Sequence, residues 1–111
     1  MHMRVWKGWT LTENATAYEE YMRGTGLTQY RATDGNRGAY MTRRDIGANT
    51  EFCMVTFWDS LDHIRAFAGD DIERAVFYPE DDRFLVDREW TVTHYAVVDG
   101  PSGVPNGSAS P

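Results

Sequence analysis

His94 and Arg43 are the two side chains whose types most directly suggest chemistry. His94 stands in an alternating run with Trp90, Val92 and Ala96, an apolar setting in which an imidazole can act as a base near neutral pH. Arg43 is permanently charged and can stabilise an oxyanion. With a dry aromatic cavity, a base and a cation can form an electron-rich phenolate or enolate that reduces oxygen directly.

Trp6, Trp58 and Tyr78 are the candidate walls of such a cavity and therefore candidate substrate-binding residues. Trp58 ends an apolar run just before a helix. Tyr78 precedes Pro79 at a predicted helix end, and its hydroxyl would point toward the sheet if that short helix folds back. All three rings also fit an ordinary core, because aromatic residues supply much of the burial in small domains.

The two catalytic candidates have structural interpretations as well. His94 fits a hydrogen-bonded interior or interface histidine, and Arg43 fits a surface ion pair, for example with Glu51 across a hairpin. His63 lies at the edge of an apolar helix face near the helix start, and we assign it no role.

Other site types have no sequence motif in this chain. There is no glycine-rich phosphate loop, no His or Cys pair at metal-binding spacing, and no nucleophile elbow. The pairs Asp70-Asp71 and Asp81-Asp82 are simpler to interpret as helix caps and solvated corners than as metal ligands. We therefore expect no metal and no cofactor.

Composition limits the classes of partner. The 111 residues fit one domain, and 14% of them are aromatic, which suits an apolar cavity or a large buried interface. The formal charge of −6 opposes binding to nucleic acid and to anionic membranes. A hydrophobic aromatic small molecule is the expected ligand.

The chain contains one cysteine, Cys53, so an internal disulfide is excluded. No apolar run is long enough to span a bilayer, and no signal segment is recognisable, so we expect a cytoplasmic protein. Residues 1–3 resemble a start or vector-derived segment, 4–98 form the domain, and 99–111, rich in Gly, Pro and Ser, form a flexible tail.

Hydrophobic periodicity predicts the elements that must position these side chains. Strands are expected over 4–11, 38–46, 52–58 and 90–98, and main helices over about 12–24 and 61–68. A helical turn is expected over 27–30. A capping box at 70–73 predicts a short helix that continues to residue 77.

This element order is the split βαβ pattern of a ferredoxin-like α+β fold, with an antiparallel sheet and helices on one face. Each face of the first strand receives one tryptophan, so the second face also needs a cover. A homodimer with two sheets packed face to face, a dimeric α/β barrel, would provide it.

The segments 57–69 and 75–79 and the closing His94-Tyr95 resemble the antibiotic biosynthesis monooxygenase-like proteins of the dimeric α/β-barrel superfamily. The resemblance covers roughly residues 4–98. It implies the fold above and a range of activities, because the superfamily includes cofactor-independent quinone-forming oxygenases, haem-degrading enzymes and members with no established reaction.

Carried over residue by residue, the resemblance makes Trp58 similar to the tryptophan that lines the pocket in both branches. Ala68 stands near the position of the axial histidine of the haem-degrading branch, and 7–9 lack its strand asparagine, so haem degradation is disfavoured. Met54 and Ile64 stand where we would look for the asparagine and tyrosine of the quinone-forming branch.

The function expected from the sequence is therefore a cofactor-independent monooxygenase that acts on, or binds, a hydrophobic aromatic molecule. The alternative is a non-catalytic small-molecule-binding or structural protein of the same fold. A haem-binding or haem-degrading relative is the third and disfavoured interpretation.

Overall fold

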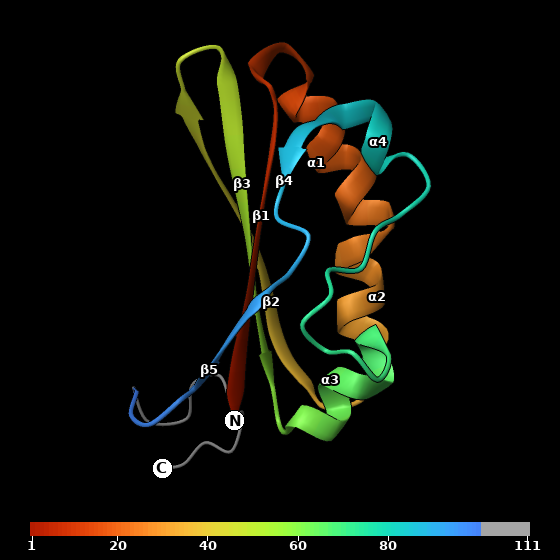
Figure 1. Ribbon diagram of the computed structural model, residues 1–111, viewed down its shortest axis with the longest axis vertical. Coiled ribbons are helices and arrows are strands. Elements are labelled where there is room, and N and C mark those ends of the chain that lie inside the picture. Colours follow the sequence, from red (N-terminus) through yellow and green to blue (C-terminus); the bar gives the residue numbers. More distant parts are fainter. Residues whose placement is uncertain (101–111) are drawn as a thin grey trace.

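The computed structural model describes residues 1–100, which form a sheet on one side and a layer of helices on the other (Figure 1). The strands run in the order β2-β3-β1-β4, and β5 also pairs with β1; every pairing is antiparallel. Their bounds are β1 His2–Leu11, β2 Asn36–Ile46, β3 Asn49–Trp58, β4 Leu85–Arg88 and β5 Thr93–Ala96. The predicted ferredoxin-like α+β fold is confirmed.

The helix layer contains η1 (Thr12–Asn14), α1 (Ala15–Gly24), α2 (Gly26–Ala32), α3 (Leu61–Ala68) and α4 (Asp81–Phe84). As expected, the chain passes directly from β3 into α3. Ser60 caps α3 by accepting a hydrogen bond from the His63 N–H at 3.3 Å. Gly69 ends the helix with φ of +90°, a conformation that other residues rarely adopt.

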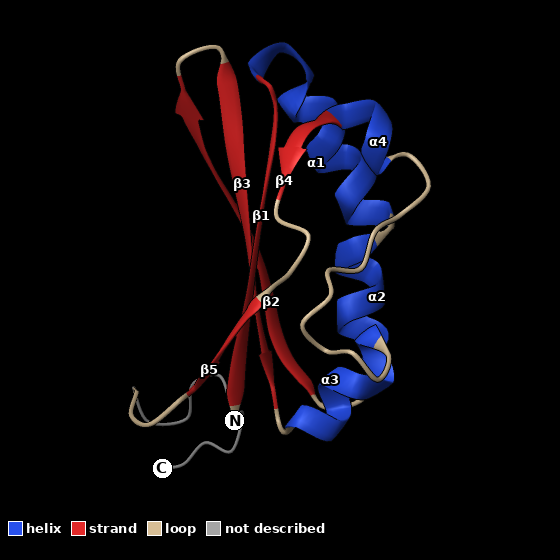
Figure 2. Ribbon diagram, in the orientation of Figure 1, coloured by secondary structure: helices blue, strands red, loops and turns tan. Residues whose placement is uncertain are grey.

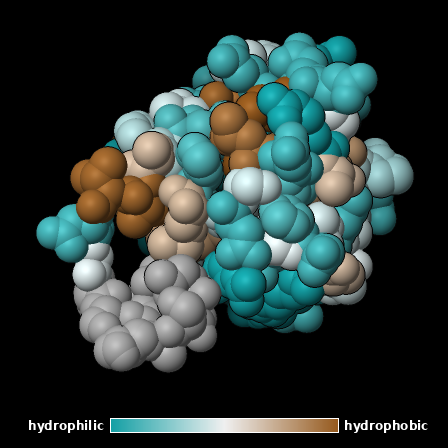
Figure 3. Space-filling model, turned by 90° about the horizontal axis from the view of Figure 1, so that it is seen from below, coloured by the Kyte–Doolittle hydropathy of each residue, from teal (hydrophilic) through white to brown (hydrophobic). Residues whose placement is uncertain are grey.

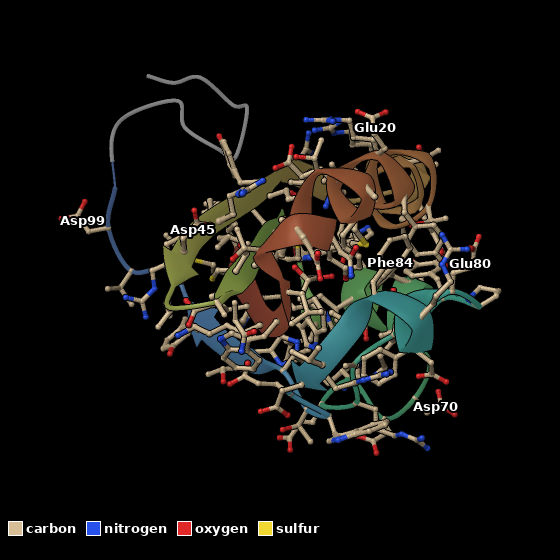
Figure 4. All side chains as sticks on the ribbon, turned by 90° about the horizontal axis from the view of Figure 1, so that it is seen from above. Glu20, Asp45, Asp70, Glu80, Phe84 and Asp99 are labelled. Carbon is tan, nitrogen blue, oxygen red and sulfur yellow. The ribbon has the colours of Figure 1, made fainter. Side chains whose placement is uncertain are left out.

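The core lies between the two layers. Its largest fully buried side chains include Trp58, Tyr18 and Phe52, and the ring of Phe84 packs 5.6 Å from that of Tyr18. Figure 4 shows Phe84 between α1 and α4, whereas Glu20, Asp45 and Asp70 lie at the periphery. The first strand alternates as predicted, so Trp6 is buried under the helices and Trp9 lies on the open face.

The segment after α3 differs from the prediction. The helix expected over 70–77 is wrong: residues 69–80 contain no helix or strand and run along the helix layer to α4 (Figure 2). Backbone hydrogen bonds to the C-terminal segment replace helical ones: the Ala75 N–H donates to the Trp90 carbonyl at 3.0 Å, and the Val92 N–H donates to that of Glu73 at 2.8 Å. Tertiary pairing overrides the local capping signal.

These bonds also divide the predicted strand 90–98, of which only Thr93–Ala96 (β5) is paired with β1. The acidic corner predicted to be solvated is instead the start of α4, and Asp81 is only 3% exposed. In residues 1–100 no helix is long and apolar enough to cross a membrane. Almost all of the predicted tail, 99–111, lies outside the described residues.

Candidate functional site

A small cavity of about 20 Å³ lies between the sheet and the helix layer. It is enclosed by β1, α1, α2, α3, the 69–80 segment, α4 and the residue that precedes β5. A space of this size holds about one water molecule. Its lining residues are Arg4, Trp6, Tyr18, Met22, Tyr30, Phe67, Val76, Tyr78, Asp81 and Val92.

Arg4 is the cationic group of the cavity. It lies on the inward face of β1, two residues before Trp6, and is 5% exposed. Its guanidinium donates to the backbone carbonyls of Ile72 (2.5 Å) and Arg74 (3.1 Å), which fixes the 69–80 segment over the sheet. Within residues 1–100 no carboxylate forms an ion pair with it. Burial lowers its pKa.

His94 contacts Arg4 and does not line the cavity. The two residues are opposite each other in the β1–β5 pairing, and Arg4 Nη1 lies 3.0 Å from His94 Nε2. Arginine cannot accept a hydrogen bond, so His94 Nε2 is the acceptor and the imidazole is neutral. Burial and the neighbouring charges of Arg4 and His2 lower the pKa of His94. The geometry makes His94 a support for the Arg4 side chain.

Asp81 is the acidic group of the cavity. One carboxylate oxygen, Oδ2, accepts a hydrogen bond from the Tyr78 N–H at 2.7 Å, and the other, Oδ1, is buried without a partner in the described residues. The hydroxyl of Tyr18, a fully buried residue, likewise has no partner there. Burial raises the pKa of both groups, and the negative charge of Asp81 raises that of Tyr18 further.

Tyr30 and Tyr78 lie near both charged groups. Burial raises the pKa of Tyr30 to about 12, with Arg4 acting to lower it and Asp81 to raise it. The pKa of Tyr78 is raised as well, mainly by burial, and the same two charges act on it. The Tyr78 hydroxyl donates to Gln29 Oε1 at 2.7 Å, which joins the 69–80 segment to α2 at the solvent edge of the cavity.

Two of the three predicted substrate-binding residues, Trp6 and Tyr78, line the cavity, and the third lies behind its wall. Trp58 is fully buried, donates from its indole N–H to Thr56 Oγ1 at 2.8 Å, and stacks on Phe67 with 5.5 Å between ring centroids. Phe67 is the ring that faces the cavity.

Arg43 lies outside the cavity, near the end of β2. Its guanidinium pairs with Glu19 (2.7 Å) and Asp45 (3.4 Å). The example partner from the sequence, Glu51, pairs instead with Arg44 at 3.1 Å, because the β2–β3 register places Arg44 opposite it. The structure therefore does not bring Arg43 and His94 together.

Two residues of the cavity, Arg4 and Asp81, were not predicted from the sequence. Arg4 carried a signal, because it shares a strand face with Trp6, and a charged residue on an inward face indicates a polar site. Asp81 carried none. Its burial depends on α4 folding over α1, which the acidic run does not reveal.

The sequence matches no family model and no curated protein. Several solved structures share the fold, including the following three. A candidate antibiotic biosynthesis monooxygenase from Bacillus cereus has a TM-score of 0.64 at 10% identity and covers 91% of this chain and 96% of its own. One from Nitrosomonas europaea has a TM-score of 0.64 at 14% identity, covering 89% and 100%.

The third is a mutant of MhuD with two manganese protoporphyrin IX molecules bound per active site, with a TM-score of 0.59 at 17% identity. It covers 93% of this chain and 100% of its own. At these identities the comparison concerns the fold. The chain therefore has the ferredoxin-like fold of the antibiotic biosynthesis monooxygenase-like proteins, as the sequence resemblance predicted.

Proposed function

We propose that this protein binds a hydrophobic aromatic molecule with an acidic oxygen between its sheet and helices, and oxidises it with molecular oxygen as a cofactor-independent monooxygenase. The observation that carries the proposal is the buried guanidinium of Arg4, which lines an aromatic cavity without a carboxylate partner in the described residues.

A buried cation is unfavourable unless an anion or several hydrogen bonds compensate it. The hydrogen bonds of Arg4 use Nη1 twice and Nη2 once, so Nε–H and a second Nη2–H remain available to a ligand. A phenolate or enolate oxygen matches these donors in charge and geometry. The neighbouring rings of Trp6 and Phe67 suit the hydrophobic part of such a ligand.

Asp81 is the proton acceptor in this proposal. A carboxylate whose pKa is raised by burial is a better base than an exposed one, and its Oδ1 is free to accept a proton. Charge left on the substrate is held by Arg4, and the electron-rich anion then reacts with oxygen. For a ring methylene the balance is complete: one O₂ converts CH₂ to C=O and releases one water.

Ligand entry requires the cavity to enlarge, since small-molecule sites are typically about 300–1,000 Å³. The 69–80 segment is the part of the wall without helix or strand. Tyr78 fastens it to α2 through the side chain of Gln29. We expect the site to open there.

Haem does not fit the residues present. Ala68, where the resemblance implies an axial histidine, is the last residue of α3. His63 lies in the first turn of α3, with its ring Nδ1 2.7 Å from Ser60 Oγ and the ring packed against Gly35. No histidine lines the cavity.

We also propose that two copies pair through the open sheet face, as the sequence analysis predicted. The face carries the exposed side chains of Tyr40 and Tyr95, and the ring of Tyr40 packs edge-on against Phe57 at 6.1 Å. At the end of the molecule seen in Figure 3, hydrophobic residues also reach the surface among hydrophilic ones. Sedimentation should give a dimer, and Val55→Asp, at the centre of this face, should give a monomer. A monomeric unmodified chain would refute this arrangement.

Oxygen uptake with anthrone and 2-naphthol tests the catalytic proposal. We expect quinone formation that is lost in Arg4→Gln, with Arg4→Lys retaining part of it, and native circular dichroism for both variants. Ligand-induced thermal stabilisation without turnover would instead support the non-catalytic binding protein. A haem titration accompanies the assay, and a shifted Soret band would contradict our assignment.

A further inference from the structure

We infer that the ligand of this cavity has two polar ends: an anionic oxygen bound by Arg4, and a hydroxyl group bound between Tyr18 and Asp81. This inference rests on the proposed function and narrows its substrate to hydroxylated aromatic molecules that carry a second, acidic oxygen across the ring system.

The hydroxyl end is defined by two buried atoms. Tyr18 has no exposed surface and Asp81 is 3% exposed, yet the Tyr18 hydroxyl and Asp81 Oδ1 have no hydrogen-bond partner within residues 1–100. Both residues line the cavity. An unsatisfied buried polar atom is costly, so two in one cavity indicate a polar group that is meant to lie between them.

The chemistry of the pair restricts that group. Ionised Asp81 can only accept a hydrogen bond, and the Tyr18 hydroxyl can donate one. A hydroxyl satisfies both with a single atom, because it donates to Asp81 Oδ1 and accepts from Tyr18. An ammonium group offers no acceptor, and a carbonyl offers no donor.

The two ends are separate. Arg4 projects from strand β1 of the sheet, whereas Asp81 is the first residue of α4 in the helix layer, where its Oδ2 accepts a hydrogen bond from the Tyr78 N–H. The cation therefore faces the cavity from the sheet and the carboxyl faces it from the helix layer. The hydroxyl that is hydrogen-bonded to Asp81 Oδ1 can pass its proton to that carboxylate, and a conjugated ring then delocalises the resulting phenolate charge toward Arg4.

Three matched probes test the inference in binding experiments that require no turnover: 6-hydroxy-2-naphthoate, 2-naphthoate and 2-naphthol, measured by isothermal titration calorimetry. We expect the hydroxynaphthoate to bind about tenfold more tightly than either single-ended probe, as the hydrogen bonds made by its second polar end allow. Tyr18→Phe should abolish this advantage and leave 2-naphthoate binding unchanged. Arg4→Gln should abolish the preference for 2-naphthoate over 2-naphthol.

Tyr21→Phe and Arg37→Gln are the matched controls, because neither side chain lines the cavity; both should keep the ranking of the probes. If the three probes bind equally, or if Tyr18→Phe keeps the advantage of the hydroxynaphthoate, the inference is wrong and water serves the Tyr18–Asp81 end. If no probe binds, the proposed aromatic site fails together with it.

Discussion

Arg4 and Arg43 occupy comparable places and have opposite surroundings. Each lies in a strand with its charge over a phenylalanine ring, at 5.8 Å for Arg4 over Phe67 and 5.9 Å for Arg43 over Phe52. Arg43 is a third exposed and has two carboxylates within 4 Å, whereas Arg4 is buried and has backbone carbonyls and an imidazole. The difference arises from the 69–80 segment, which covers β1 but not the end of β2.

The comparison shows that strand alternation predicts which way a charge faces and not what meets it there. At the sheet edge a charge meets other surface charges, and such exposed pairs contribute little to stability. Beneath the 69–80 segment, the guanidinium of Arg4 meets no carboxylate in the described residues. Its N–H groups that make no hydrogen bond can bind a ligand.

The largest expected effect on stability comes from Phe67, whose ring lies beneath the Arg4 guanidinium. Phe67→Ala should lower the free energy of unfolding by about 3–5 kcal/mol, because the ring packs between Trp58 and Tyr30. Urea denaturation measures it, with Val86→Ala, at a half-exposed position, as the control. An equal loss of unfolding free energy in Phe67→Ala and Val86→Ala would show that the cavity wall is not a packed core.

Arg4→Gln should weaken binding of 2-naphthoate by about 10- to 100-fold, since a hydrogen bond to a charged group is worth about 1.5–3 kcal/mol. Arg43→Gln should change it less than twofold. Calorimetric titration of both variants distinguishes the two arginines. A comparable loss in Arg43→Gln would instead support the catalytic role predicted for Arg43 from the sequence.

The contributions of Asp81 in the cavity and of Glu19 beside Arg43 to folding stability should also depend on pH with opposite signs. Burial raises the pKa of Asp81 above its ordinary value of 3.8, so its protonated form favours folding. That stability is present below pH 3.8 and is lost as the pH rises through the raised pKa. Asp81→Asn should therefore match the unmodified protein near pH 4 and be more stable at pH 7, as measured by urea denaturation.

Glu19 provides the opposite case. The hydrogen bond from Arg43 lowers its pKa from 4.5, so its contribution is present above pH 4.5 and is lost as the pH falls through the lowered value. Glu19→Gln removes the ion pairs with both Arg43 and Arg23, so it should lose a small amount of stability at pH 7 and less at acid pH. If Asp81→Asn follows the same trend as Glu19→Gln, the cavity carboxyl is not desolvated.

The smallest effect is expected for the stability of Arg43→Gln. The pair of Arg43 with Glu19 is partly exposed, so its loss should be near the limit of detection in urea denaturation and smaller still in 0.5 M salt, about three times the physiological ionic strength. A clear loss of stability in Arg43→Gln that does not depend on salt would mean that the ion pair at the sheet edge is not solvated.

The sequence was sufficient for the fold because local signals and tertiary packing agree there. The passage from β3 into α3 is encoded by alternation that ends at Trp58, a cap at Ser60 and a glycine at 69. It was insufficient for the site, because Arg4 and Asp81 acquire their environments from segments distant in the chain. The capping signal at 70–73 even favoured a helix where long-range backbone pairing to 90–92 prevails.

The interruption between β4 and β5 has a consequence for solubility. A continuous fourth strand would leave a long row of unpaired backbone groups at one edge of the sheet, which is a template for pairing with another chain. Instead each piece is four residues long, and residues 73–75 take up backbone groups of the gap. At the opposite edge, β2 is eleven residues long and carries three arginines. Both edges are thus protected against edge-to-edge aggregation, one by its shortness and the other by its charge.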